Sequence, residues 1–209
     1  LALGDRHDFI NASDECYSEI YYDEQQAPSG ILAACLNRGR SDFSRCLAFN
    51  SLSKRSNAAG LRSGFVAGDA TLLSAYLLYR TYHGSAMPLH HQEASIAAWS
   101  DEQHVQENRQ RYTEKLSAVI DILQQAITIE APAGGFCLWL PTPCHSVDFV
   151  ESLYREQSVI ALPDSYLARD NRQQHNPGEQ FIRVALVAAK NDCIEASHRL
   201  VEHYQAVSG

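Results

Sequence analysis

The sequence has no long apolar run, no excess of basic residues and no CxxC pair of cysteines, and each absence excludes a class of protein. Its longest apolar stretch, residues 70–79, is interrupted by polar residues and falls far short of the ~20 residues that cross a bilayer. Lys and Arg total 17 against 25 Asp and Glu, and this net charge of −8 argues against a nucleic-acid or anionic-membrane partner. Six cysteines in 209 residues are too few for a disulfide scaffold, so we expect reduced thiols in a cytoplasmic protein.

Two further site types lack support. The chain contains no G-x-G-x-x-G sequence, which argues against a dinucleotide site. The adjacent His90 and His91 do not aim at one metal ion from regular structure, and Cys137, Cys144 and His145 lack an evident fourth ligand. We therefore expect no metal site.

Strand-like and helix-like segments alternate over the first half of the chain, which is typical of an α/β architecture. Strands are predicted at 9–13, 45–50 and 64–67, and helices at 30–37 and 70–82, the second with Asp69 as its N-cap. The second half predicts a small α+β domain, with a long amphipathic helix at 101–127, strands at 136–140, 159–162 and 181–187, and helices at 147–156 and 192–204. We expect a domain boundary near residue 100.

The chain opens on Leu1, and residues 1–7 read as the last turns of a helix that leads into a strand. A natural N-terminus rarely starts inside such a unit. We therefore expect a fragment that lacks an upstream part.

Polar residues cluster after two of the predicted strands, where α/β folds place active sites. The first cluster is residues 13–17, the second is residues 51–54 followed by Asn57, Gly60 and Arg62, and Arg183 lies within the apolar run FIRVALV. Taken singly, each has a structural explanation: a solvated lysine, an aspartate that starts a turn, or an arginine on an edge strand.

Taken together, these residue types suit pyridoxal phosphate chemistry. Such an enzyme needs a lysine for the Schiff base and proton transfer, and an aspartate that keeps the pyridine nitrogen protonated. Hydroxyls and a cation hold the phosphate, and an arginine grips the substrate carboxylate.

Four motifs, in the right order over essentially the whole chain, resemble class I/II aminotransferases of fold type I. S-x-S-K-x-x-N-x-x-G-x-R-x-G at 51–64 is similar to the family's cofactor-lysine motif, with Arg62 eight residues after Lys54. S-D-E-x-Y-x-E-I-Y at 13–21 is similar to its Asp-x-x-Tyr strand end, and PAGGFCLWLP at 132–141 and FIRVALV at 181–187 match its small domain. The resemblance implies a partial large domain at 1–99, with a mixed sheet and flanking helices, and a small α+β domain at 100–209, joined by the helix at about 101–127.

The same resemblance implies the residue roles. Lys54 forms the Schiff base and moves the proton, Asp14 pairs with the pyridine nitrogen, and Tyr17 bonds the ring 3′-oxygen. Ser51 and Arg62 bind the phosphate with help from Ser53. Arg183 binds the substrate α-carboxylate.

The family's upstream phosphate loop, its residue that stacks on the pyridine ring and several of its strands have no counterpart here. Because family members form their sites between two subunits, we expect a homodimer at full length. We expect this chain alone to be inactive.

Residues 53–69 and 94–112 are most similar to succinyldiaminopimelate aminotransferases of bacterial lysine biosynthesis. This implies amino transfer between N-succinyl-diaminopimelate and 2-oxoglutarate. Two alternatives stay open: another amino acid aminotransferase of the same superfamily, or a non-catalytic effector or oligomerisation module.

Overall fold

The computed structural model describes residues 1–208, and its contacts divide the chain into two compact units. The first unit is Leu1–Arg109, and the second begins at Gln110. Helix α6 (Gln103–Leu123) starts in the first unit and ends in the second. The identities of the two parts as large and small domain stay predictions.

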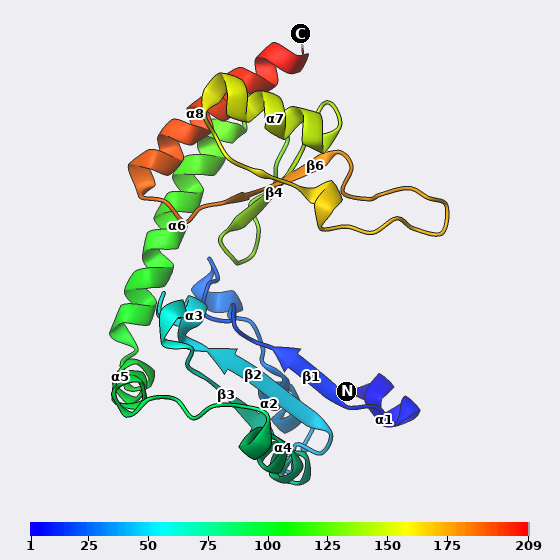
Figure 1. Cartoon of the computed structure of the whole chain (residues 1–209), viewed down its shortest axis with the longest axis vertical. Coiled ribbons are helices and arrows are strands. Elements are labelled where there is room, and N and C mark those ends of the chain that lie inside the picture. The colour runs from blue at the N-terminus through cyan, green and yellow to red at the C-terminus, as the bar shows by residue number, and fades with distance from the viewer. Residues whose placement is uncertain (209) are drawn as a thin grey trace. The chain divides into compact units, whose positions relative to one another are not determined.

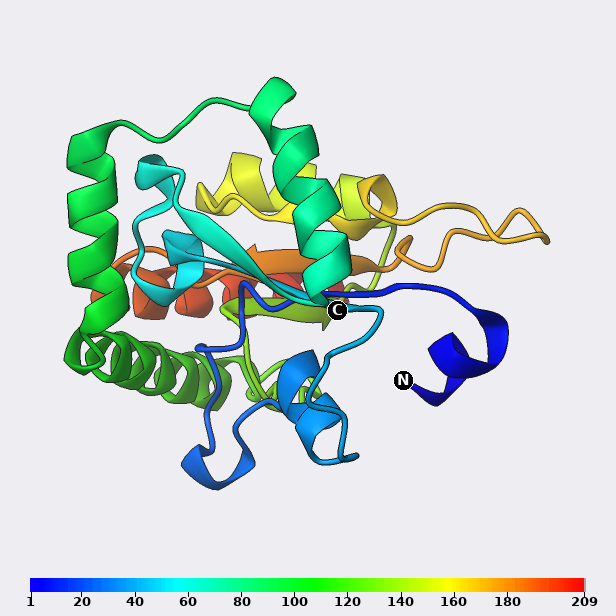
Figure 2. The ribbon, with the colours of Figure 1, turned by 90° about the horizontal axis from the view of Figure 1, so that it is seen from below.

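The first unit contains a three-stranded mixed sheet (Figure 1). β1 pairs in parallel with β2, and β2 pairs antiparallel with β3. Helix α2 contacts β2 and α4 contacts β3 (Figures 1 and 2). The elements of this unit are α1 (Ala2–His7), β1 (Asn11–Asp14), α2 (Ile31–Leu36), β2 (Cys46–Ser51), α3 (Leu52–Arg55), β3 (Gly64–Gly68), α4 (Ala70–Tyr82) and α5 (Leu89–Ser100), with short 3₁₀ turns η1 (Glu24–Gln26) and η2 (Ala59–Leu61).

The second unit contains an antiparallel sheet of order β4-β6-β5. Figure 1 shows α6, α7 and α8 gathered on one side of that sheet. Leu138, Ile182, Phe149, Val119 and Leu200 supply core side chains from strands and helices, each at most 2% exposed. The elements are β4 (Cys137–Pro141), α7 (Ser146–Gln157), β5 (Leu162–Pro163), η3 (Asp164–Tyr166), β6 (Phe181–Ala185) and α8 (Lys190–Ser208).

The expected α/β class with a mixed sheet is confirmed, and so is the cap of α4. Asp69 Oδ1 accepts hydrogen bonds from the backbone N–H groups of Thr71 at 2.8 Å and Leu72 at 3.1 Å. Two of the four N–H groups that the first turn of a helix leaves unpaired are thereby satisfied.

Several elements have other bounds than expected, and one helix was not predicted. The helix predicted at 101–127 is shorter. The Asp101 carboxylate accepts from Gln103 N at 2.9 Å at its start, and beyond Leu123 the backbone N–H groups of Gln125 and Ala126 bond carbonyls three residues back instead of four. The strand predicted at 159–162 reaches β6 only at Leu162 and Pro163. Helix α5, which starts after Pro88, was not predicted because its apolar residues have no clear period.

Within residues 1–208 we find no helix whose length and apolar character would suit a membrane crossing. All six cysteines are free thiols.

Candidate active site

The parallel pairing of β1 and β2 brings the two polar clusters to one edge of the sheet. Asp14, the last residue of β1, lies opposite Phe49 of β2, which ends shortly after at Ser51. A hollow of about 450 Å³ opens at this edge. It is lined by Cys16, Ser51, Ser53, Lys54, Arg62, Ser63 and Gly64. Four of the predicted site residues therefore share one hollow.

Lys54 lies on α3, a single turn that follows β2 directly. The turn starts at Ser51, whose Oγ accepts a hydrogen bond from Ser53 N at 3.3 Å. Asn50 Oδ1 accepts from Ser51 N at 2.8 Å, which fixes the junction of strand and helix. Lys54 is half-buried, and its Nζ lies 5.6 Å from the centre of the Tyr17 ring. The predicted lysine and tyrosine are thus neighbours.

Asp14 is connected to the residues of the hollow through Cys16, which lines it. Its Oδ1 accepts from Cys16 N at 3.1 Å, and hydrogen bonds from the Cys16 side chain and backbone lower the pKa of the Asp14 carboxyl. Burial raises the pKa of the Cys16 thiol, Asp14 raises it further, and Ser51 and Lys54 oppose the rise. Asp14 is therefore held ionised near neutral pH, as a partner of a protonated ring nitrogen must be.

Arg62 and Gly64 close the other side of the hollow. Arg62 has a φ of 52° at the end of η2, and its Nη1 donates to Ala59 O at 2.9 Å. A Cβ on Gly64 would lie 2.6 Å from the carbonyl oxygen of Asn50, so the pairing of β3 with β2 requires glycine here.

Arg183 belongs to the second unit, where it lies on β6. The edge-strand explanation is wrong, because β6 is the central strand between β4 and β5. Arg183 pairs across the sheet with Trp139, and both side chains are on the exposed face. Along β6 the neighbouring Ile182 faces the core. Strand alternation therefore puts the guanidinium on the open face of an apolar strand.

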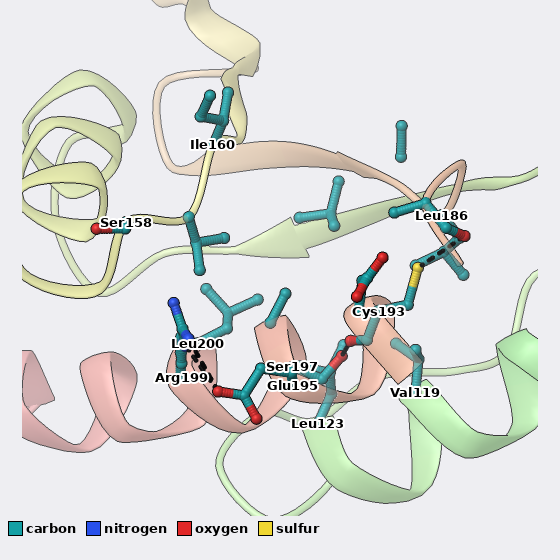
Figure 3. A pocket seen from close by; sticks show the side chains of 16 residues that line it. Val119, Leu123, Ser158, Ile160, Leu186, Cys193, Glu195, Ser197, Arg199 and Leu200 are labelled. Atoms are coloured by element: carbon teal, nitrogen blue, oxygen red, sulfur yellow. Dashed lines mark hydrogen bonds and ion pairs between the residues drawn. The ribbon is translucent and has the colours of Figure 1, made fainter. Parts of the chain in front are cut away.

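A second hollow, of about 440 Å³, lies within the second unit (Figure 3). Its walls are largely aliphatic, with Val119, Leu123 and Leu200 among them. Two of its charged side chains pair with each other, since Arg199 Nη2 lies 2.9 Å from Glu195 Oε1. The hollow beside Lys54 is the better candidate because polar groups converge in it.

Sequence reasoning assigned no role to Cys16, Ser63, Arg55 or Arg109. Cys16 and Ser63 line the hollow, and each stands inside a motif that had been singled out for other residues. Arg55 and Arg109 are 3% and 7% exposed, although arginine in a polar segment usually indicates a solvated surface. No sequence signal distinguishes them.

The residues around the hollow fit pyridoxal phosphate by their chemistry. They provide an amine for an aldehyde and hydroxyls and a guanidinium for a phosphate. Asp14, which does not line the hollow but bonds Cys16, adds a carboxylate of lowered pKa that suits a pyridinium nitrogen. Among residues 1–208 there is no group of three or more His, Cys, Asp or Glu that is placed to hold a metal ion.

Comparison with known proteins agrees with this chemistry. The family described as aminotransferase class I and II matches residues 1–198. A 4-dedimethylamino-4-oxo-anhydrotetracycline transaminase of Streptomyces rimosus is 32% identical, over 91% of this chain and 50% of its own length. An LL-diaminopimelate aminotransferase of Maridesulfovibrio salexigens is 30% identical, over 96% of this chain and 50% of its own length.

The crystal structure of an aminotransferase from Neisseria meningitidis is also similar to this chain, with 51% identity and a TM-score of 0.90. The match covers 97% of this chain and 51% of that one. The chain thus spans about half the length of the relatives it matches. The likeness confirms the expected partial fold of type I.

Proposed function

Because this chain belongs to the aminotransferase class I and II family, whose members use pyridoxal phosphate, we propose that it carries the cofactor lysine of a transaminase. The complete protein transfers an amino group between an amino acid and a 2-oxo acid. The observation that carries the proposal is one hollow in which Lys54 lies with Ser51, Ser53 and Arg62, with Tyr17 beside the lysine.

Each residue has a separate task. When bound, the cofactor supplies an electron sink for the substrate α-carbon. Lys54 anchors the aldehyde and moves the proton, and Asp14 holds the proton on the pyridine nitrogen. Tyr17 bonds the 3′-oxygen.

Serine hydroxyls and two arginines bind the anionic groups of the cofactor and the substrate. Ser51, Ser53 and Arg62 bind the phosphate through hydroxyls and a guanidinium. Arg183 binds the substrate α-carboxylate with its planar fork.

For the substrate we propose N-succinyl-diaminopimelate, with glutamate and 2-oxoglutarate as the second pair. The support is the resemblance of residues 53–69 and 94–112 to that subfamily, together with diaminopimelate aminotransferase relatives. Another amino acid substrate is the second candidate, because an arginine that binds the α-carboxylate recognises a group that all amino acids share. Comparing the turnover of N-succinyl-diaminopimelate with that of LL-diaminopimelate by the complete protein separates the two.

We further propose that residues 1–99 are the C-terminal part of a cofactor-binding large domain and residues 100–209 a small domain. The order of the four motifs supports this division. The complete protein would be a cytoplasmic homodimer.

The test of the lysine assignment is simple, because the chain has only three lysines, Lys54, Lys115 and Lys190. Borohydride reduction of the complete protein after incubation with pyridoxal phosphate should place the label on Lys54, as read by peptide mass spectrometry. In the complete protein, Lys54→Ala should lose roughly 10²–10⁴-fold or more in turnover, because a general base alone contributes that much. Lys190→Ala is the control, and preferential label on Lys115 or Lys190 contradicts the proposal.

A further inference from the structure

Helix α3, which carries Lys54, is too short to be stable by itself. It has four residues, and an isolated turn fixes several backbone dihedrals for one hydrogen bond. The direction of the Lys54 side chain therefore depends on what holds α3 from outside.

Arg55 holds α3 through an ion pair with two hydrogen bonds. Its side chain is 4% exposed, and it grips Glu102, just before α6, with Nη2 to Oε1 at 2.5 Å and Nη1 to Oε2 at 3.2 Å. Its Nη1 also lies 3.4 Å from Glu19 Oε1. The guanidinium carbon lies 5.3 Å from the Trp99 ring centre. A bidentate pair between a buried guanidinium and a carboxylate restricts orientation as well as position.

Further contacts run from the same short segment to the first turns of α6. Asn108 Nδ2 donates to the carbonyl oxygen of Lys54 at 3.4 Å, and Asn57 Nδ2 donates to Asn108 Oδ1 at 2.7 Å. Ser56 Oγ lies 2.8 Å from His104 Nε2. Residues 54–57 are thus each tied to the stretch 102–108.

The partner of Arg55 and the hollow lined by Lys54 lie on different sides of α3. Successive residues of a helix point about 100° apart, so a side chain anchored at Arg55 sets where its neighbour Lys54 points. Arg55 is directed to Glu102, and Lys54 lines the hollow. We propose that the Arg55–Glu102 pair is a positioning device that directs the Lys54 ammonium to the cofactor aldehyde. This inference rests on the proposed function.

Arg109 provides a matched comparison within the same unit. It is also buried, pairs with Glu24 at 2.7 Å and stacks over Tyr21 at 4.2 Å. It shares Glu19 with Arg55, since its Nη1 lies 3.4 Å from Glu19 Oε2. These partners lie in the segment after β1. Glu24 is the partner that Arg109 does not share with Arg55, so loss of the Glu24 carboxylate should leave the Arg55–Glu102 pair and the direction of Lys54 in place.

The experiment measures labelling of the complete protein by pyridoxal phosphate with borohydride trapping, as the ratio of label on Lys54 to label on Lys190 across a pH series. A misplacement of ~1 Å costs a reacting group on the order of 10²-fold, so Arg55→Met should lower the ratio about tenfold or more. Arg55→Lys keeps the charge without the fork and should restore only part of it. Arg109→Met removes a contact of the shared Glu19 but leaves the Arg55–Glu102 pair, so it should lower the ratio much less than Arg55→Met.

Glu102→Gln and Glu24→Gln form a second matched pair for the case in which Arg55→Met does not fold. Both carboxylates are exposed, at 65% and 70%, so both variants should fold. Glu102→Gln should lower the ratio, and Glu24→Gln should not. An unchanged ratio in Glu102→Gln, or an equal fall in both members of a pair, overturns the positioning role. If the wild-type complete protein shows no preference for Lys54, the proposed function itself fails.

Discussion

At the scale of single residues, Arg183 shows how a strand directs a charge. Among the described residues of β4, β5 and β6 it is the only charged side chain. It lies on the open face, beside the exposed Trp139. A cation in such surroundings suits a carboxylate ligand with an apolar remainder.

We expect Arg183→Lys to weaken carboxylate substrates without loosening the cofactor. Losing one hydrogen bond between charged groups costs about 1.5–3 kcal/mol, so KM in the complete protein should rise about tenfold or more. Borohydride labelling of Lys54 should persist. Arg199→Lys, on the exposed side of α8, is the control. Unchanged KM and kcat for every amino donor would show that Arg183 does not bind the carboxylate.

The sequence indicated Asp14, Lys54 and Arg62 because residue type and spacing within a motif carry chemical information. No role for Arg55 follows from the sequence, although this residue directly follows Lys54. Its partners Glu19 and Glu102 are 36 and 47 residues away, and no local pattern encodes such a pairing.

At the scale of elements, α6 shows that a helical period translates directly into burial. Tyr112, Leu116, Val119 and Leu123 recur at helical spacing, and all are at most 8% exposed. Such a stripe stabilises a helix through packing more than through intrinsic propensity.

Leu116→Ala should therefore destabilise the second unit. Truncating a buried leucine to alanine costs about 2–5 kcal/mol, through lost transfer free energy and a residual cavity. Urea unfolding followed by Trp139 fluorescence measures this change. Ser117→Ala, at an exposed neighbouring position on the same helix, should have little effect. Equal midpoints for the two variants would argue against a packed α6 stripe.

The ends of elements were less predictable than their interiors. Helix α6 starts where the Asp101 carboxylate accepts from the Gln103 N–H group. Strand β5 is limited to Leu162 and Pro163, the two residues that pair with β6. Helix α5 has neither a periodic stripe nor a side-chain cap, so only its surroundings decide that it is helical.

At the scale of the whole molecule, ionised carboxylates contribute to the stability of the first unit. Hydrogen bonds lower the pKa of five carboxyls in the described part of that unit. The donors are Cys16 to Asp14, Arg109 to Glu24, the Arg45 backbone to Asp69, His104 to Asp101, and Arg55 to Glu102. A carboxyl whose folded pKa lies below its unfolded value, about 3.9 for Asp and 4.3 for Glu, binds fewer protons when folded.

The stability from these groups is therefore present above about pH 4.5 and is lost as the pH falls through their folded pKa values. We expect the urea midpoint of the first unit to fall between about pH 5 and pH 3. Trp99 reports on this unit in Trp139→Phe, and Trp139 reports on the second unit in Trp99→Phe. Glu102→Gln should flatten the Trp99 profile. A Trp99 midpoint that does not change with pH would contradict the expectation.

The sequence by itself determined the α/β class, the strands and helices with clear periods, and the chemical identity of the residues around Lys54. These depend on neighbours within a few turns or strands, where side-chain pattern and backbone geometry are directly related. Tertiary structure decided which strand is central, how far β5 extends, and which arginines are buried. It also decided that Glu102 and Asn108 hold the turn that carries Lys54, because pairing across many residues depends on the closure of the fold.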